Sequence, residues 1–408
     1  MRTLSWMKPR LPALLPLLCL AACFGRSPNG EFRIDGNVPG PGPEFSTALF
    51  QVVDLRMKPG NKVDPIDNGK VFEAAIEEIS RAQKSIHLVT FIWADGEVSN
   101  RMIDAMTARA GAGVQCRILV DAVGSLALGD IQGRLEQGGC EVHKLRPIPG
   151  QDNAARVHRK IIVIDGKVGF TGGFGIDDKW DGDGLHDEPK PQWRDSNLRV
   201  RGPAVADMQR AFSENWQEVT GQLLPGDAFP PPEDAGTAQA AFMASTAHAI
   251  ATNNDRLTQL LIQAARKRLW ISNAYFVPST PIMELLTRKA RAGVDVRVMA
   301  AGDKTDIKPY LPNQRARMDQ LARDGVKAYE YEPTMMHGKT MIVDDSLVAI
   351  GSCNLDALSL NKMDEGALVV EDRALADEES RRFLEDLTHS KQRIPDDLPA
   401  PIKKTAAR

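Results

Sequence analysis

The chain has 408 residues, of which 42% are hydrophobic, 26% charged and 6% aromatic, and its formal net charge is −3. This length and composition predict a globular protein of about two or three domains with a large buried core. The acidic balance and the pI near 6.2 exclude the overall basic character that nucleic-acid-binding proteins usually carry. They do not exclude a local basic site for lipid phosphates.

The first residues of the chain have the form of a secretory signal. An apolar run from Leu11 to Ala22 follows a basic segment and is too short to span a membrane as a helix. It ends at Cys23 in the sequence Leu-Ala-Ala-Cys, which resembles the lipobox of bacterial lipoproteins; cleavage of an ordinary signal peptide elsewhere is the alternative. We therefore expect lipidation of Cys23. Phe24, where an aspartate would direct retention, resembles the signal for an outer-membrane lipoprotein that faces the periplasm in the cell envelope.

Segments rich in glycine and proline divide the remainder of the chain. Residues 24–47 have the composition of a tether, and Pro225 to Gly236 forms a second such segment. No later segment is apolar enough to span a bilayer, so lipid on Cys23 would be the firm anchor. The predicted organisation is a signal peptide (1–22), a lipidated tether (23–47), a first domain (48–222), a linker (223–240), a second domain (241–394) and a disordered tail (395–408).

The two predicted domains resemble each other. Apolar residues at helical spacing in 72–79 precede a strand-like run at 86–92, and residues 257–264 precede 269–277 in the same way. Two further pairs of segments match across the halves, 108–121 with 288–301 and 134–145 with 320–331. Strands that alternate with helices predict an α/β fold of two similar α/β/α sandwich lobes with mostly parallel sheets. A repeat of roughly 180 residues indicates a duplicated domain rather than a solenoid.

Each half contains a histidine and a lysine two residues apart, followed by an apolar strand and an aspartate. The first set is His158, Lys160 and Asp165, and the second is His337, Lys339 and Asp344. Residues two apart on a strand share a face, so each histidine and its lysine are predicted to point the same way. The aspartates complete the candidate catalytic set, although their place at the far end of the strand suits a turn or a lysine contact better than reaction.

This combination suits the transfer of a phosphodiester. A neutral imidazole can attack phosphorus and carry the phosphoryl group covalently, while the second imidazole donates a proton to the leaving alcohol. The two lysines supply the positive charge that a metal supplies elsewhere, so we expect no metal and no cofactor. Ser352 and Asn354 can add hydrogen bonds to the phosphate oxygens.

A carboxylate on the other nitrogen of each histidine would fix its tautomer. The candidates are Asp195 and Glu365, which lie 37 and 28 residues after the histidines of their own halves. Either of them could instead be an ordinary surface carboxylate.

The paired HxKxxxxD motifs resemble those of the phospholipase D superfamily, and the surrounding residues look most like bacterial cardiolipin synthases. The stretches that carry this resemblance include residues 112–114, 275–279, 291–296 and 351–356, and the similarity covers about residues 60 to 390. It implies one active site between two lobes, with one histidine as nucleophile and no required metal; family precedent favours His158, although the symmetry of the sequence leaves the choice open. Two positions depart from the family pattern: Gly175 and Met363 stand where asparagine is usual.

Other features have simpler interpretations. The His186 loop could bind a cation, but no second ligand cluster accompanies it, so we expect a solvated loop near the site. Trp180 and Trp193 flank this loop and are expected to pack against the core rather than touch acyl chains. Cys116 and Cys140 could pair in an exported protein, but we expect buried free thiols.

Three functions remain open at this stage. The leading one is a phosphatidyltransferase of the cardiolipin-synthase type that acts through a phosphohistidine. The second is hydrolysis at the same site, by a phospholipase D or less plausibly an exported nuclease, and the third is lipid binding without catalysis. The expected partners are a phospholipid substrate and the membrane surface, with no nucleic acid, and the protein is expected to be a monomer.

Overall fold

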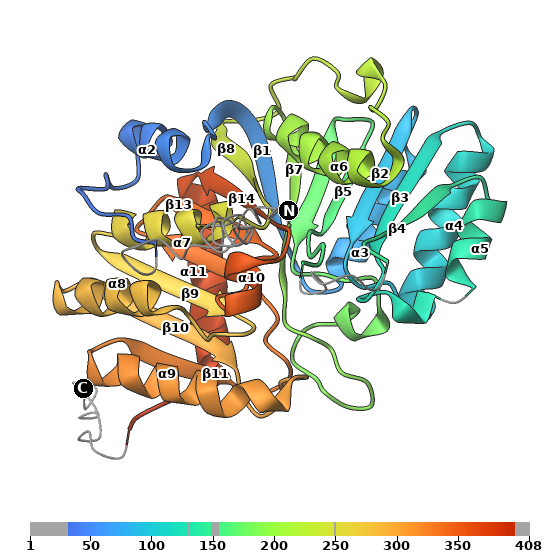
Figure 1. The fold of residues 1–408 in the computed structure, drawn as a ribbon. Coiled ribbons are helices and arrows are strands. Elements are labelled where there is room, and N and C mark those ends of the chain that lie inside the picture. The colour runs from blue at the N-terminus through green and yellow to red at the C-terminus, as the bar shows by residue number, and fades with distance from the viewer. Residues whose placement is uncertain (1–31, 129, 148–154, 249, 396–408) are drawn as a thin grey trace, which may run out of the picture.

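A computed structural model describes residues 32–128, 130–147, 155–248 and 250–395 (Figure 1). The first lobe alternates strands with helices, as its sequence pattern predicts. Its elements are β1 (Lys58–Asp67), α3 (Lys70–Ser80), β2 (Ser85–Thr90), α4 (Glu97–Gly111), β3 (Gln115–Asp121), η2 (Leu126–Leu128), α5 (Ile131–Gln137), β4 (Glu141–Leu145), β5 (Ile161–Ile164), β6 (Val168–Gly172), η3 (Asp178–Trp180), β7 (Ser196–Arg201) and α6 (Ala204–Thr220).

The second lobe repeats this order after the short helix η4 (Gly226–Ala228). Its elements are β8 (Ala238–Ser245), α7 (Asn253–Ala264), β9 (Arg268–Asn273), α8 (Thr280–Arg291), β10 (Asp295–Ala301), η5 (Lys308–Tyr310), α9 (Leu311–Arg323), β11 (Lys327–Tyr331), β12 (Thr340–Val343), β13 (Leu347–Gly351), α10 (Ala357–Asn361), β14 (Glu365–Glu371), α11 (Arg373–Thr388) and β15 (Ser390–Gln392).

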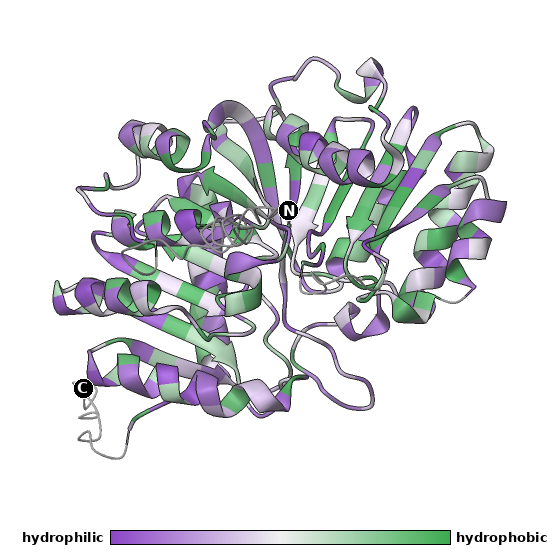
Figure 2. Ribbon diagram, in the orientation of Figure 1, coloured by the Kyte–Doolittle hydropathy of each residue, from purple (hydrophilic) through white to green (hydrophobic). Residues whose placement is uncertain are grey.

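One continuous sheet runs through both lobes. Its strands lie in the order β15-β11-β10-β9-β12-β13-β14-β8-β1-β7-β6-β5-β2-β3-β4. Except for β15, the order reads the same outward from the β1–β8 contact in both directions, so each strand has a counterpart in the other lobe. The predicted duplicated α/β fold is therefore confirmed. Hydrophobic residues concentrate on the strands and on the helix faces turned toward them (Figure 2).

The expectation of mostly parallel sheets is wrong, because the sheet is mixed. Pairing is parallel only between β2, β3 and β4 and between β9, β10 and β11. The motif strands β5 and β12 instead continue through tight turns into β6 and β13, which pair with them in antiparallel fashion. A strand connected by so short a turn cannot run parallel to its neighbour, because parallel strands require a crossover.

The N-terminal boundary predicted for the first domain also differs from the structure. Residues 43–47, assigned to the tether, begin helix α2 (Pro43–Val53), whose buried residues Phe45, Leu49 and Val53 belong to the core of the second lobe. Their spacing of four residues is typical of one face of a helix. The glycine- and proline-rich residues around them made this pattern hard to recognise in the sequence. Strand β8 likewise begins inside the predicted linker.

Some predictions concern segments outside the described residues. The predicted signal peptide and Cys23 fall within residues 1–31, and nearly all of the predicted tail falls within 396–408. In the described part of the chain, no helix combines the length and apolar character that a bilayer crossing requires.

Cys116 and Cys140 form a disulfide, which corrects the expectation of free thiols. Strands β3 and β4 are parallel neighbours with Arg117 opposite Glu141. One residue back along this register brings Cys116 opposite Cys140, with their Cα atoms 4.6 Å apart. The sequence did not reveal this pairing, because the pairing depends on the register of two strands and the two cysteines are 24 residues apart in the chain.

We expect replacement of both paired cysteines by alanine to lower the free energy of unfolding by about 3 kcal/mol, because the unfolded chain regains the entropy of the loop that the disulfide closes. Denaturant unfolding with and without reductant measures this. Cys353→Ala, at a free cysteine, is the control for thiol removal. Unfolding of the wild-type protein that does not respond to reductant would contradict the pairing.

Candidate active site

The two histidines lie where the lobes meet. His158 precedes β5 and His337 precedes β12, each in a short extended segment. Each segment is held by the other lobe: His158 N donates to Asp364 O at 2.8 Å, and His337 N donates to Arg194 O at 2.7 Å. The motifs that the sequence separates by more than a hundred residues therefore face one site.

The carboxylates that orient the histidines come from the opposite lobes. Glu365 contacts His158 Nδ1 at 3.0 Å through both carboxylate oxygens, and Asp195 Oδ2 contacts His337 Nδ1 at 2.8 Å. Both predicted carboxylates are thus in the site, but each serves the histidine of the other half rather than its own. Because Nδ1 is engaged in this way, Nε2 of each imidazole remains for substrate.

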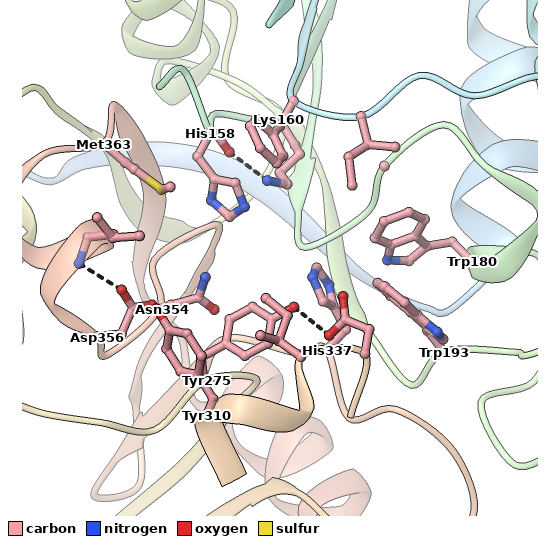
Figure 3. A pocket seen from close by; sticks show the side chains of 16 residues that line it. His158, Lys160, Trp180, Trp193, Tyr275, Tyr310, His337, Asn354, Asp356 and Met363 are labelled. Atoms are coloured by element: carbon pink, nitrogen blue, oxygen red, sulfur yellow. Dashed lines mark hydrogen bonds between the residues drawn. The ribbon is translucent and has the colours of Figure 1, made fainter. Parts of the chain in front are cut away.

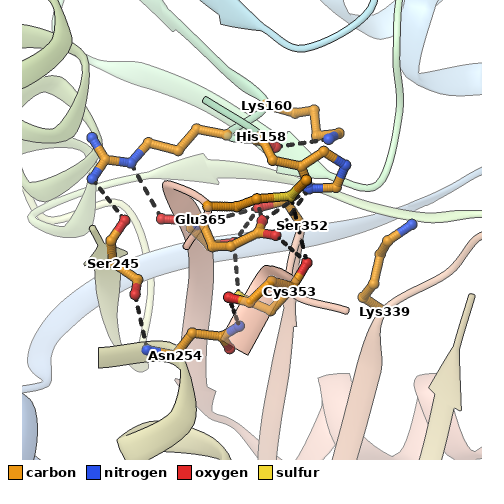
Figure 4. A network of polar contacts seen from close by, with 12 residues as sticks. His158, Lys160, Ser245, Asn254, Lys339, Ser352, Cys353 and Glu365 are labelled. Atoms are coloured by element: carbon orange, nitrogen blue, oxygen red, sulfur yellow. Dashed lines mark hydrogen bonds and ion pairs between the residues drawn. The ribbon is translucent and has the colours of Figure 1, made fainter. Parts of the chain in front are cut away.

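The two carboxylates accept hydrogen bonds from different donors. Glu365 accepts hydrogen bonds from the hydroxyls of Ser352 and Ser359 (Figure 4). Asp195 accepts from Trp180 Nε1 and from the Ser196 amide, each at 2.8 Å. The Ser352 hydroxyl is therefore engaged with Glu365 and positions it, instead of lying free for phosphate as predicted.

Trp180 explains the departure from the family pattern in the first half. A Cβ on Gly175 would lie 2.8 Å from the Trp180 ring, and one on Gly173 would lie 2.2 Å from Asp195 Oδ1. The indole thus fills the space that a side chain at 175 would need, and its N–H replaces the hydroxyl donor that Ser352 provides in the second half. The only sign of this role of Trp180 in the sequence is that Gly173 and Gly175 stand where the second half has Ser352 and Asn354.

Both motif lysines are buried beside their histidines. Lys160 Nζ donates to His158 O at 2.7 Å, and Lys339 Nζ donates to His337 O at 2.5 Å. Lys339 Nζ also lies 2.9 Å from both ring nitrogens of His337. Burial lowers the pKa of Lys160 to about 7 and that of Lys339 to about 8. A bound anionic phosphodiester would raise both pKa values again, since an opposite charge favours the protonated form.

The histidines are neutral in the free site. Burial lowers the pKa of His337 to about 3, with Lys339 acting in the same direction, and burial also lowers the pKa of His158. Burial alone would raise the pKa of Glu365, but His158 and Lys160 outweigh it and keep that pKa below its usual value. The site therefore holds neutral imidazoles against ionised carboxylates, which is the state that a nucleophilic histidine requires.

We expect kcat/KM to fall as the pH rises through about 7 to 8, because the free enzyme loses the protons of Lys160 and Lys339 there. The acid limb should lie below the ordinary histidine range. The alkaline limb of kcat should lie at higher pH than that of kcat/KM, because bound phosphate raises the lysine pKa values. Measurement of both pH profiles across the histidine and lysine titration ranges checks this. A kcat/KM that stays constant until the pH reaches the ordinary pKa of lysine would contradict it.

Asp165 and Asp344 are not catalytic, which corrects their inclusion in that set. Asp165 accepts backbone hydrogen bonds from residues 83–85, and Asp344 accepts from residues 266–268. Both have positive φ, 54° and 52°, at the turn that follows the motif strand. They fix that turn at the end of the strand far from the histidines, the role that their position had suggested.

Two buried arginines join the lobes next to the reactive groups. Arg159, beside His158, donates to Glu365 O at 3.2 Å and to Ser245 O at 3.1 Å. Arg194, beside Asp195, pairs with Asp386 at 2.9 Å. Neither role is visible in the sequence, because it depends on partners in the other half of the chain, which Arg159 binds in addition to Asn215 and Arg194 in addition to Asn68 of their own half. These contacts between the lobes hold each histidine next to the carboxylate of the opposite lobe.

A cavity of about 220 Å³ opens between the histidines (Figure 3). It is lined by His158, Lys160 and His337, by Phe91, Ile92, Gly175, Trp180 and Trp193 of the first lobe, and by Tyr275, Asp306, Ile307, Tyr310, Asn354, Asp356, Leu358 and Met363 of the second. Asn354 lies in the wall of the cavity, and its contact with phosphate stays a prediction. Trp180 and Trp193 both pack on the His337 ring, with centroids 5.2 and 5.0 Å away.

The charged side chains of the His186 loop are engaged with other residues. His186 contacts Asp183, and Asp187 pairs with Lys304 of the second lobe at 2.6 Å. Among the residues that the structure describes, no group of three or more potential metal ligands occurs. The loop instead ties the two lobes together beside the cavity.

Comparison with protein families matches residues 75–186 and 259–387 to the family described as cardiolipin synthase, PLD-like domain. Cardiolipin synthase A of Pseudomonas aeruginosa is 33% identical over 356 residues, which cover 86% of this chain and 72% of that protein. A cardiolipin synthase of Geobacillus thermodenitrificans is 34% identical over 72% of this chain and 60% of its own length. The phosphatidylserine synthase of Haemophilus influenzae has a similar fold, with a TM-score of 0.65 at 14% identity over 85% of this chain and 92% of that one.

Proposed function

Since the chain belongs to the cardiolipin synthase family of phospholipase D-like proteins, we propose that it transfers a phosphatidyl group from a phospholipid to a lipid alcohol. The observation that carries this proposal is the pair of buried histidines, each held by a carboxylate of the other lobe, on one cavity that Lys160 also lines, with Lys339 beside His337. Because one chain supplies both motifs, a monomer suffices. The family and the acidic net charge favour a lipid over a nucleic acid as substrate.

In this mechanism His158 Nε2 attacks phosphorus and forms an N–P bond as the P–O bond to the headgroup alcohol breaks. His337, neutral in the free site, takes up a proton at Nε2 when the anionic substrate binds, because an opposite charge favours the protonated form, and gives this proton to the departing oxygen. Lys160 and Lys339 stabilise the charge on the non-bridging oxygens. The acceptor alcohol then gives its proton to neutral His337 and attacks phosphorus, so that the N–P bond breaks and His158 is restored.

The assignment of His158 as the nucleophile follows the family resemblance, since each motif lysine lies beside the histidine of its own half in the same way.

The test is incubation of purified protein with labelled phosphatidylglycerol or phosphatidylethanolamine, with and without an alcohol acceptor. Transfer predicts a new phospholipid that depends on the acceptor. Phosphatidic acid as the sole product, whatever the acceptor concentration, would favour the second candidate, a hydrolase. Failure to convert either lipid would contradict the proposed function.

We also propose that the protein acts at the cell envelope as a lipoprotein. The disulfide supports export, because such bonds persist mainly in oxidising compartments. The lipobox-like sequence at Cys23 supports an anchor.

Cys23→Ser is expected to leave the protein unlipidated and to move it from the membrane to the soluble fraction. Labelling with palmitate followed by membrane fractionation checks this, with Cys353→Ser as the matched control. A wild-type protein that takes up no label would contradict the anchor without affecting the proposed reaction.

A further inference from the structure

The second-lobe wall of the cavity is acidic and aromatic, which a phosphate alone does not explain. Figure 3 shows Tyr275, Tyr310 and Asp356 along the wall below His158, and Asp306 also lines the cavity. Two carboxylates beside the binding place of an anionic phosphodiester would repel it. The substrate of this site should therefore carry a group that is attracted to negative charge next to its phosphate.

Asp356 is the deep member of this wall. Its side chain is only 4% exposed, and burial raises the pKa of the carboxyl to about 6, so it is mostly ionised at neutral pH. Its Oδ1 accepts the amides of Leu358 and Ser359 at the start of α10. This leaves Oδ2 for a group bound in the cavity.

The tyrosines add aromatic faces. The rings of Tyr275 and Tyr310 have centroids 5.7 Å apart and are tilted by 55°. The Tyr275 hydroxyl donates to Asp306 at 2.7 Å, which fixes the ring and places the second carboxylate at the outer edge of the wall. Aromatic faces and carboxylates together are the surroundings that proteins use to bind ammonium groups.

Asn354 specifies the type of ammonium group. Its side chain is 3% exposed and lines the cavity, and its Oδ1 has no hydrogen-bond partner within the described structure. In Figure 3 it extends into the space between Asp356 and the histidines. A buried amide oxygen needs an N–H or O–H donor. A primary ammonium group has three N–H donors, whereas a quaternary one has none.

We propose that Asp356, Asn354, Tyr275 and Tyr310 form a subsite for a primary ammonium group, so that the phosphatidyl donor is a zwitterionic aminophospholipid. This inference rests on the proposed function and names the substrate of the same site. The donor's phosphate lies between the histidines and lysines while its ammonium group lies against the acidic wall. When the P–O bond breaks, the amino alcohol leaves with the proton from His337 on its oxygen.

The test compares three donors in vesicles with glycerol as the common acceptor: phosphatidylethanolamine, phosphatidylcholine and phosphatidylglycerol. For the wild-type protein we expect kcat/KM for phosphatidylethanolamine to exceed each of the others by about tenfold or more, the scale expected for a charged hydrogen bond. Asp356→Asn should reduce the ratio of phosphatidylethanolamine to phosphatidylglycerol by about tenfold. Asparagine also caps helices, so this variant should preserve α10.

Two further variants make the result specific. Tyr310→Leu removes one ring face and should reduce the same ratio. Asp303→Asn changes an exposed carboxylate that is bound to Arg315, on the loop that carries Asp306, so it should leave the ratio unchanged. If Asp356→Asn and Asp303→Asn gave the same ratio, or the wild-type protein preferred phosphatidylglycerol, the subsite would be refuted.

A binding measurement separates the subsite from the proposed reaction. Calorimetry with the His158→Ala protein and glycerophosphoethanolamine should give an affinity about tenfold higher than that with glycerophosphoglycerol, and Asp356→Asn should remove the difference. If the wild-type protein converts no phospholipid, the proposed function fails, yet this experiment still decides on the ammonium subsite. Equal affinity for the two probes would overturn it.

Discussion

His158→Ala is expected to abolish the covalent phosphatidyl adduct and to lower turnover by about three or more orders of magnitude, the scale seen when a nucleophile is removed. His158 Nε2 faces the cavity while Nδ1 is held by Glu365, so no other imidazole can attack from its side. Wild-type protein given labelled phospholipid should carry an adduct that is labile to acid and stable to base, as a phosphohistidine is.

His337→Ala is the matched variant of this experiment. It should lose turnover to a similar extent, yet it should still form adduct from a substrate with a good leaving group, which needs little protonation. Adduct in the His158→Ala protein and none in His337→Ala would reverse the assignment and preserve the mechanism. Unchanged turnover in both variants would contradict catalysis at this site.

The sequence sufficed to predict the reactive groups because they lie in short local patterns. His158 and Lys160, and their counterparts His337 and Lys339, are two residues apart, so any extended backbone brings each pair to one face. The duplication was visible because the segments that repeat are continuous in the chain. Local patterns of this kind also gave the alternation of strands and helices, but not the direction of β5 and β12 relative to their neighbours.

What the sequence could not predict depends on tertiary contacts, both between the lobes and within each lobe. Glu365 was paired with His337 because they share a half, whereas the two-fold arrangement of the lobes brings it to His158. The hydrogen bond from Trp180 to Asp195 depends on how the loop before β7 folds within the first lobe. Ser352 appeared free to bind phosphate because nothing in its local sequence indicates the carboxylate that it contacts.

The crossed pairing predicts that Glu365→Gln and Asp195→Asn differ in how their effect depends on the leaving group of the substrate. Each variant keeps the shape of the side chain and removes the charge that orients a histidine, so each should lower turnover by about a hundredfold to ten-thousandfold. Glu365 holds the nucleophile, so Glu365→Gln should slow formation of the adduct with every substrate. Asp195 holds the general acid, so its loss should matter chiefly when the leaving alcohol needs a proton.

Single-turnover kinetics with two donors distinguishes these effects: a natural phospholipid, and an analogue whose leaving group is a nitrophenol. Asp195→Asn should form adduct slowly from the phospholipid and nearly normally from the analogue, whereas Glu365→Gln should be slow with both. Asp364→Asn, at a buried carboxylate beside Glu365 that contacts Arg146 and Asn215, controls for disturbance of the lobe interface. The histidine variants above identify the nucleophile independently. With His158 as the nucleophile, rescue of Glu365→Gln and not of Asp195→Asn by the analogue would mean that each carboxylate acts on the histidine of its own half, which would contradict the crossed arrangement.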